Sequence, residues 1–420
     1  MIWSTLSRFS RRARTSDIIR TTFVNYVGLA VTAGTSILVA RALGPAGRGE
    51  FAAIMTWFAL ALVLGELGQS GAITYWVARL KDRAPSTVAS GRHLTLVGAT
   101  VTAAGMIALS PTLARGDAEL AIAYVIAFSA CLVNGVWGPS VYALQAVSIA
   151  AWNAVRLSQS ILYAVGVVVV LVAQLASVLS LAVVLALSMT CQLSIAAIIG
   201  SRLGLGGGRA SRRELVKLGR YGVAYAGSQI PATGAAQYDK AFLSQTVSTS
   251  ALGQYAVATT VASLSGPLAT AIASVVFPRL SRTIHDETSR RKAENRAILI
   301  TVGMSGLVIA MIAAIAAPVV PALFGREYLD AILLVWMLLP SMYFRAISEL
   351  NSVFTRSRGR PGLVTWSRVS GLVVGVCLIV PLVAMAGPGG AAISVFALEG
   401  TTLLVSSLIL WKLRRSERQG

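Results

Sequence analysis

The residues best suited to chemistry in this chain are ionisable side chains that interrupt long apolar stretches. Six of them do so: Glu66, Asp239, Lys240, Arg345, Glu349 and Glu399. Placing a charge at the centre of a membrane helix costs about 3 kcal/mol on insertion scales, so such residues are kept for a purpose. We therefore treat each as a candidate for ion coupling or for binding a charged ligand.

The acids among these residues differ in their neighbours along the chain. Glu66 and Glu399 have no opposite charge within one helical turn, so each is a candidate proton or sodium site, or a hydrogen-bonded group at a helix contact. Arg345 and Glu349 are four residues apart, which favours an ion pair on one helix face. Glu349 is nevertheless kept as a third candidate for ion coupling. Asp239 and Lys240 either line a cavity or reach out to the membrane interface.

The elements that must position these side chains are membrane-spanning helices. The chain is 55% hydrophobic and only 12% charged, whereas soluble domains have about 25% charged residues. Runs of about 17–25 apolar residues are long enough to cross about 30 Å of hydrocarbon. We predict an all-α membrane protein with twelve spans near 23–40, 51–67, 94–110, 120–137, 157–176, 178–200, 218–243, 253–277, 297–323, 331–353, 366–386 and 390–411.

The basic residues alternate from gap to gap between these spans. Thirty of the 36 Lys and Arg residues fall on one side of the membrane and one, Arg345, lies within a span. The other side receives five: Arg41, Arg48, Arg115, Lys240 and Arg326. Positive charge is retained on the cytoplasmic side, so this pattern places both termini in the cytoplasm of a multi-pass plasma (inner) membrane protein.

The predicted domain organisation follows from the spans. A basic segment, 1–22, precedes an N-terminal lobe of six helices, 23–200. A glycine-rich cytoplasmic linker, 201–217, leads to a C-terminal lobe of six helices, 218–411, and a basic tail, 412–420.

The two halves also resemble each other in sequence. Gly49-x-Phe51-Ala52 matches Gly253-x-Tyr255-Ala256 at an offset of 204 residues, and Ala78-Arg79-Leu80 matches Pro278-Arg279-Leu280 at an offset of 200. An even number of spans per half starts both halves on the same side, so the repeats are parallel. Bundles of this kind place a cavity between two lobes that rock against each other.

Several stretches resemble a known family. They are LVARALGPAGRGEFA (38–52), VARL (77–80), YDKAFLSQ (238–245), LGQYAVA (252–258), FPRLSR (277–282) and LFGREY (323–328). They resemble polysaccharide flippases of the O-antigen type in the multidrug/oligosaccharidyl-lipid/polysaccharide (MOP) exporter superfamily. The resemblance implies two six-helix lobes and the flipping of a polyprenyl-diphosphate-linked glycan to the outer leaflet. Lipid II flippases of this superfamily usually have two further spans, which are missing from the twelve assigned to this chain.

A lipid diphosphate on the cytoplasmic side would require cations and hydrogen-bond donors at the inner ends of helices. Arg20 and Asn25 at the first span, Arg156 at the fifth and Arg220 at the seventh are our candidates. Each could instead be an interfacial anchor. Tyr221, Tyr225 and Gln229 are spaced by four along the seventh span, which suits sugar stacking and hydrogen bonding, although helix packing explains the same stripe. With Asp239 and Lys240, these form the predicted substrate-binding set.

Other functions fit the sequence less well. A net charge of +20 would suggest nucleic acid in a soluble protein, but here the charges flank apolar spans. The three cysteines and two histidines form no metal motif, and no cofactor is expected. A cation-coupled drug exporter is the main alternative, and a membrane-embedded glycosyltransferase or polymerase is disfavoured by short external loops. We expect a monomeric transporter, not an enzyme, that works among membrane lipids and alongside polysaccharide polymerase or glycosyltransferase machinery.

Overall fold

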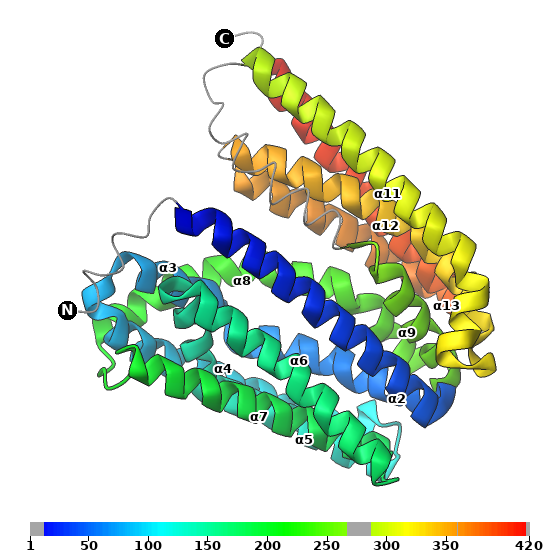
Figure 1. The fold of residues 1–420 in the computed structure, drawn as a ribbon, viewed down its shortest axis with the longest axis horizontal. Helices are drawn as coiled ribbons and strands as arrows, with labels where there is room; N and C mark the ends of the chain where they lie inside the picture. The colour runs from blue at the N-terminus through cyan, green and yellow to red at the C-terminus, as the bar shows by residue number, and fades with distance from the viewer. Residues whose placement is uncertain (1–11, 267–286, 359, 417–420) are drawn as a thin grey trace. The chain divides into compact units, whose positions relative to one another are not determined.

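The structure is a computed structural model that describes residues 12–266, 287–358 and 360–416. Regular secondary structure in this part of the chain is entirely helical, which confirms the all-α prediction (Figure 1). The helices are α2 (Arg12–Glu66), α3 (Gln69–Arg79), α4 (Ala84–Leu113), α5 (Ala118–Val147), α6 (Ile149–Val172), α7 (Val178–Arg202), α8 (Arg212–Thr246), α9 (Thr249–Ser263), α11 (Glu287–Phe324), α12 (Asp330–Ser357) and α13 (Pro361–Ser416). Short 3-10 turns cover Lys81–Arg83 and Arg326–Tyr328.

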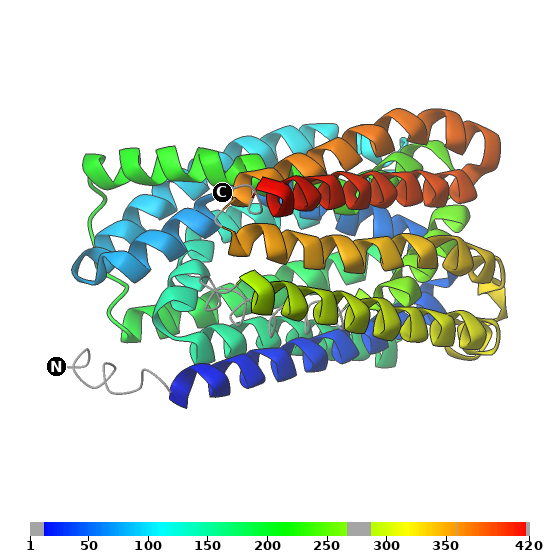
Figure 2. The ribbon, with the colours of Figure 1, turned by 90° about the horizontal axis from the view of Figure 1, so that it is seen from above.

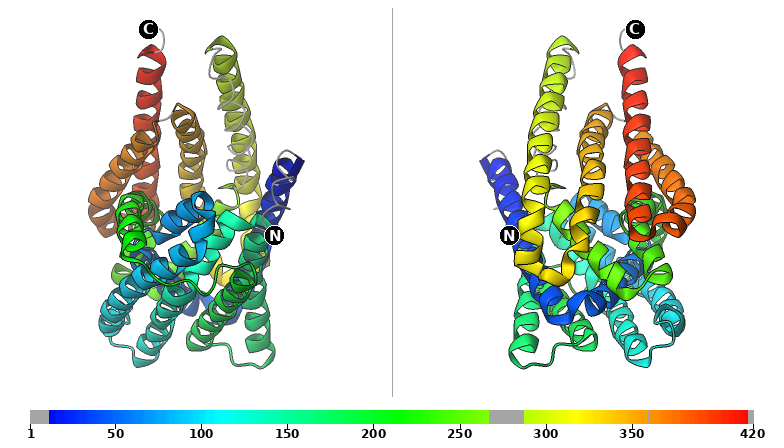
Figure 3. Two further views of the ribbon diagram at one scale, coloured as in Figure 1. Left: turned by 90° about the vertical axis from the view of Figure 1, so that its left-hand side faces the viewer. Right: turned by 90° about the vertical axis from the view of Figure 1, so that its right-hand side faces the viewer.

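Two of the helices contain an internal break. Gly44 in α2 has φ 65°, and Gly387 in α13 has φ 53°, a left-handed conformation that glycine adopts without steric cost. The two halves of α13 form a hairpin at this point, visible in orange and red in Figure 3. Both helices therefore provide two crossings each.

Eight helices in the described residues are long and apolar enough to cross a membrane. The doubled α2 and α13 raise this number to ten crossings, and α8 with α9 supplies the region predicted for spans seven and eight. The predicted twelve-helix fold class is therefore confirmed. Part of span eight, 267–277, lies outside the described residues.

Several helices extend beyond the predicted spans. The second span ends as predicted, since α2 ends at Glu66; the chain then turns at Leu67 and Gly68 with positive φ, and a separate helix, α3, follows to Arg79. By contrast, α4 begins at Ala84 instead of 94, α5 continues to Val147 instead of 137, and α8 begins at Arg212 instead of 218. Apolar runs mark where helices cross hydrocarbon, whereas polar helical turns beyond them leave no hydropathy signal.

Serine and aspartate start several helices by capping their free amides. The side chain of Asp117 accepts a hydrogen bond from the Leu120 amide at the start of α5, and Ser248 accepts one from Ala251 at the start of α9. Ser177 and Ser180 form a reciprocal capping box at the start of α7. These caps define the short turns that separate the spans.

The described chain forms two compact units. One combines 12–42 with 57–230, and the other combines 43–56 with the described residues of 231–416. In the first unit α5 packs against α3, α4 and α7, around buried residues such as Tyr124, Phe128 and Leu144. In the second, α12 packs against α9, α11 and α13, and Figure 2 shows α11, α12 and α13 running side by side. The six-helix lobes predicted over 23–200 and 218–411 stay a prediction.

The repeated Gly-x-aromatic-Ala motif forms a close helix crossing within the second unit. A Cβ atom on Gly49 would overlap the backbone oxygen of Thr249, and one on Gly253 would overlap that of Pro45. The aromatic residues that follow, Phe51 and Tyr255, are 4% and 0% exposed. The glycines thus let the backbones of 43–56 and α9 touch, so the motif has a packing role.

Candidate functional site

Glu66, the last residue of α2, lies at the break before α3 in the first unit. Its carboxylate accepts a hydrogen bond from the hydroxyl of Tyr142 on α5, and the polar side chains of Ser70 and Asn134 lie nearby. The residue is half-buried. The sequence showed that Glu66 has no partner in its own helix, but it did not indicate that Tyr142 would supply one from 76 residues away.

Two predicted residues meet near the start of the first and fifth spans. Arg156 donates a hydrogen bond from Nη1 to Oδ1 of Asn25 at 3.2 Å, and its guanidinium lies 4.5 Å from the ring centroid of Trp152. Beside them, Asn153 donates to Thr21 at 2.8 Å. Stacking on Trp152 holds the guanidinium in a fixed plane, which leaves its other N–H groups available to an oxyanion. Arg20, from the same predicted group, is exposed.

The tyrosine stripe of α8 packs against α3. A Cβ on Gly71 would lie 2.7 Å from the Tyr225 ring, and Tyr221 stacks on Tyr75 with centroids 4.8 Å apart. Lys217 sits 5.2 Å from the Trp76 centroid. These contacts give both tyrosines a clear packing role, so sugar binding by Tyr225 stays a prediction. On the same helix, Arg220 is exposed and Gln229 is half-buried.

Asp239 on α8 is buried, with 6% of its surface exposed. Its Oδ2 accepts a hydrogen bond of 2.7 Å from Tyr255 of α9, while its Oδ1 is buried and has no hydrogen-bond partner among the described residues. The neighbouring Tyr238 shares a hydrogen bond of 3.0 Å with Ser394 of α13. The carboxylate of Asp239 is therefore held at the contact between α8 and α9, and its role in substrate binding stays a prediction. Lys240 is half-buried.

The predicted ion pair between Arg345 and Glu349 is wrong. Glu349 binds Arg356 at 2.8 Å and Arg368 of α13 at 2.6 Å instead. A base that precedes an acid by four residues is the less favourable order in a helix, and α13 brings a competing guanidinium to the same carboxylate. Arg345 is exposed and makes no hydrogen bond or ion pair with the described residues.

A polar cavity of about 80 Å³ lies within the second unit, among α8, α12 and α13. Four charged residues line it: Arg345, Glu349, Arg368 and Glu399. Ser348, Ser352 and Thr402 add hydroxyl groups, and three alanines of α8 (Ala232, Ala235 and Ala236) leave the space open. The structure thus brings together Glu349 and Glu399, which the sequence proposed separately, and adds two arginines to the same cavity.

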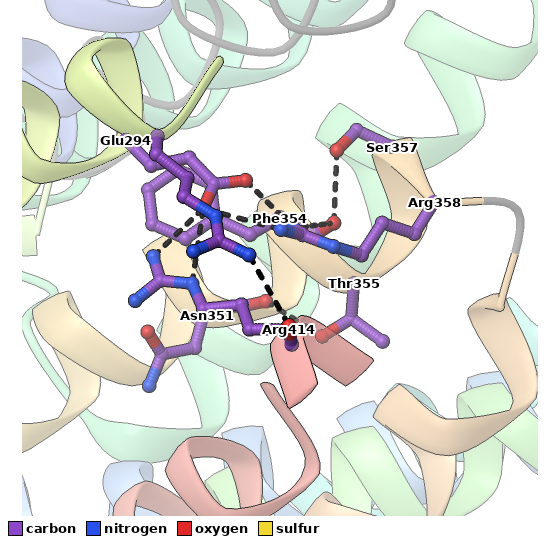
Figure 4. A network of polar contacts seen from close by, with 8 residues as sticks. Glu294, Asn351, Phe354, Thr355, Ser357, Arg358 and Arg414 are labelled. Atoms are coloured by element: carbon purple, nitrogen blue, oxygen red, sulfur yellow. Dashed lines mark hydrogen bonds and ion pairs between the residues drawn. The ribbon is translucent and has the colours of Figure 1, made fainter. Parts of the chain in front are cut away.

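A buried ion triad that the sequence did not reveal joins α11, α12 and α13 (Figure 4). Glu294 is fully buried and binds Arg358 at 2.6 Å and Arg414 at 2.7 Å. Asn351 adds hydrogen bonds from α12 to Ser406 and Ser407 of α13. The alternation of basic gaps places all three residues of the triad on the same side of the membrane. This shared side is the one feature of the sequence that is consistent with a contact among them.

No group of three metal-binding side chains occurs among the residues that the structure describes. The groups that the candidate sites bring together are carboxylates, guanidinium groups and hydroxyls at helix contacts. Such groups suit the binding of a polar ligand within a membrane bundle.

The family is established by sequence. The model of a family described as "Polysaccharide biosynthesis protein" matches residues 38–333, more than half of the chain, and the protein belongs to this family. No curated protein matches the sequence at a significant level.

Solved structures of the same fold come from the MOP superfamily. An inward-facing multidrug resistance MATE transporter is 18% identical, with 95% of this chain and 96% of that chain covered and a TM-score of 0.71. The lipid II flippase MurJ, in an inward closed conformation, is 14% identical, with 93% and 86% covered and a TM-score of 0.75. A MOP transporter from Pyrococcus furiosus is 17% identical, with 96% and 95% covered and a TM-score of 0.66. The chain therefore has the fold of MOP superfamily transporters, and the predicted resemblance is confirmed.

Proposed function

We propose that this protein moves a polyprenyl-diphosphate-linked oligosaccharide, the repeat unit of a polysaccharide, from the cytoplasmic to the outer leaflet. The match of residues 38–333 to the polysaccharide biosynthesis family carries the proposal. The MOP fold supports it, since lipid II flippase and MATE transporters share that fold. Transport would proceed by alternating access of two lobes, without an enzymatic step.

The hydrogen-bonded pair of Arg156 and Asn25 is the proposed entry point for the diphosphate. An arginine presents N–H groups in a planar fork that matches phosphate oxygens, and Trp152 keeps that fork oriented. Arg20 and Arg220, both exposed, would add positive charge on the same side of the membrane. This positive charge would first attract anionic lipid headgroups. The diphosphate of the substrate would then take their place.

The intramembrane acids are the proposed coupling groups. Within the described part of the chain, Glu66 is hydrogen-bonded by the neutral hydroxyl of Tyr142 and forms no ion pair with an arginine, so a proton or a cation could exchange at its carboxylate. Glu349 is already neutralised by two arginines, so this acid is the weakest of the three coupling candidates. We place the protein in the plasma membrane as a monomer with both termini in the cytoplasm, working beside glycosyltransferases and a polymerase.

A proteoliposome assay tests the proposal. The purified full chain is reconstituted with a fluorescent short-chain isoprenyl-diphosphate-linked oligosaccharide, and an impermeant quencher reports which molecules reach the outer leaflet. Protein-dependent exchange is expected, with liposomes containing no protein as the blank and the same fluorophore on phosphatidylethanolamine as the lipid control. Exchange equal to the blank would overturn the proposal.

The fold similarity to MATE transporters keeps cation-coupled drug export as the second candidate. That function predicts that deletion of the gene lowers resistance to toxic organic cations and leaves surface glycan unchanged. The proposed function predicts the reverse: lipid-linked sugars accumulate on the cytoplasmic side of spheroplasts, and drug resistance is unaffected.

A further inference from the structure

The polar cavity of the second unit has the size of a small charged group. Its volume is about 80 Å³, and about 10–15 Å³ on such a scale is enough to hold one water molecule. The cavity therefore has room for several waters, or for a carboxylate or phosphate group in their place.

The charges in this cavity are unevenly matched. Glu349 is bound by two guanidinium groups, those of Arg356 and Arg368. The second acid, Glu399, is influenced by the charges of Arg345 and Arg368 but contacts neither in an ion pair. Arg368 is already engaged by Glu349, so Arg345 is the cation of this cavity whose charge is least compensated.

Among the side chains that line the cavity and carry donors, Arg345 is the one that uses none of them within the described residues. The hydroxyl hydrogens of Ser348, Ser352 and Thr402 are all donated to carbonyls of their own helices, at 2.8–2.9 Å. Arg368 donates to Glu349 at 2.6 Å. Arg345, by contrast, has its fork of N–H groups unused by the described residues and is exposed enough to be reached.

We propose that this cavity is an oxyanion subsite in which Arg345 binds a phosphate or carboxylate group and Glu399 competes for the same guanidinium. The inference rests on the proposed function, because a lipid-linked glycan offers both kinds of oxyanion: its diphosphate linker and any acidic sugar. An arginine binds either group through two parallel N–H donors. The hydroxyl oxygens of Ser348, Ser352 and Thr402 remain free to accept hydrogen bonds from sugar hydroxyls next to that group.

The same arrangement argues against a sodium site here. Sodium would need several oxygen ligands with net negative charge, whereas the two carboxylates that line this cavity are matched by two guanidinium groups. Glu349 would then be the fixed counter-ion of Arg356 and Arg368. Glu399 would be a counter-ion of Arg345 that the ligand displaces.

The test measures anion binding to the full-length protein in lipid nanodiscs by calorimetric titration at constant ionic strength. The probes are inorganic pyrophosphate, glucuronate and neutral glucose. The wild-type protein is compared with Arg345→Gln, Arg345→Lys, Glu399→Gln and the control Arg326→Gln, whose side chain is exposed in a turn. Thermal unfolding of each variant without anions verifies that it is folded.

We expect at least one of the two anions to bind the wild-type protein. Glucose should bind the wild-type protein no more tightly than it binds Arg345→Gln. Arg345→Gln should raise the dissociation constant of that anion at least tenfold, and Arg345→Lys by less, since a point charge lacks the bidentate geometry. Glu399→Gln should lower the dissociation constant several-fold, because the competing carboxylate is gone. The control should bind as the wild type does.

Binding of pyrophosphate alone assigns the subsite to the linker, and binding of glucuronate alone assigns it to an acidic sugar. Equal binding by the wild type and Arg345→Gln overturns the proposal, and so does a wild-type protein that binds neither anion. The proteoliposome assay distinguishes failure of this proposal from failure of the proposed function. If the protein flips the lipid-linked glycan but anion binding does not depend on Arg345, only the subsite proposal is refuted. Anion binding without flipping of any lipid-linked glycan removes the proposed function instead.

Discussion

Single residues in this protein stabilise helix contacts with buried charge. Glu294 is fully buried, and Arg358 is 4% exposed at the side chain. Breaking such a pair is costly because it leaves one charge buried without a partner, typically about 3–5 kcal/mol. Breaking the triad should therefore cost far more than breaking an exposed ion pair, and this cost favours the arrangement in which α11, α12 and α13 meet at these faces.

Replacement of Glu294 by alanine should lower the free energy of unfolding by about 3–5 kcal/mol, because Arg358 and Arg414 lose their acceptor. Thermal unfolding in detergent measures this loss. Glu119→Ala is the matched control, since that acid is exposed, and it should change stability by less than about 0.5 kcal/mol. The triple variant Glu294→Leu, Arg358→Met, Arg414→Met should recover most of the loss. Equal stability of Glu294→Ala and Glu119→Ala would contradict the role given to the triad.

The hydrogen bond from Tyr255 to Asp239 gives a second prediction for single residues. Tyr255→Phe removes the only hydrogen-bond donor that the structure shows for this buried carboxylate, and the loss should destabilise the protein by about 1–3 kcal/mol. Asp239→Asn in the Tyr255→Phe background should restore part of the stability, because a neutral amide costs less to bury. If the single Tyr255→Phe variant unfolds at the wild-type temperature, the hydrogen bond contributes no stability.

At the scale of elements, two helices touch through glycine. Gly49 and Gly253 occupy matching positions in the sequence repeat, and each lies against backbone atoms of the other segment. Close backbone approach through small residues is a common way to associate helices in membranes, where apolar burial gives little driving force.

Gly253→Ala should therefore be destabilising by about 1–3 kcal/mol or more, since a Cβ there would overlap the Pro45 carbonyl oxygen and force the helices apart. Gly49→Ala should behave in the same way. Gly105→Ala is the control: a Cβ added to this helical glycine would meet no atom within 4 Å, and alanine should be neutral or stabilising by up to about 1 kcal/mol. The unfolding temperatures of the three variants test this prediction. If Gly253→Ala unfolds at the wild-type temperature, the two backbones are not in close contact at this crossing.

At the scale of the whole molecule, the distribution of basic residues predicts orientation in the membrane. The variants Arg209→Cys and Arg326→Cys, in a background with Cys131, Cys191 and Cys377 replaced by serine or alanine, test it by labelling with an impermeant maleimide. Position 326 should label in intact spheroplasts, and position 209 only after permeabilisation. Labelling of position 209 from outside would reverse the topology.

The apolar runs and alternating charges were sufficient to predict the all-α class and the twelve crossings. These properties follow from local composition, because the bilayer imposes a length and a charge bias on each span separately. The sequence also singled out Glu66, Glu349 and Glu399 as unusual, since a charge in an apolar run needs no tertiary information to be recognised.

The partners of those charges were decided only by the tertiary structure. Arg345 is one turn from Glu349 along the helix, yet Arg368 of α13 takes that carboxylate, and Tyr142 comes from another helix to Glu66. Glu294, Arg358 and Arg414 form one buried group although up to 120 residues separate them. The physical reason is that ion pairs and hydrogen bonds depend on which helix faces meet. Those faces are chosen by packing of the whole bundle, as at Gly49 and Gly253, whereas burial in the membrane depends only on each segment's own composition.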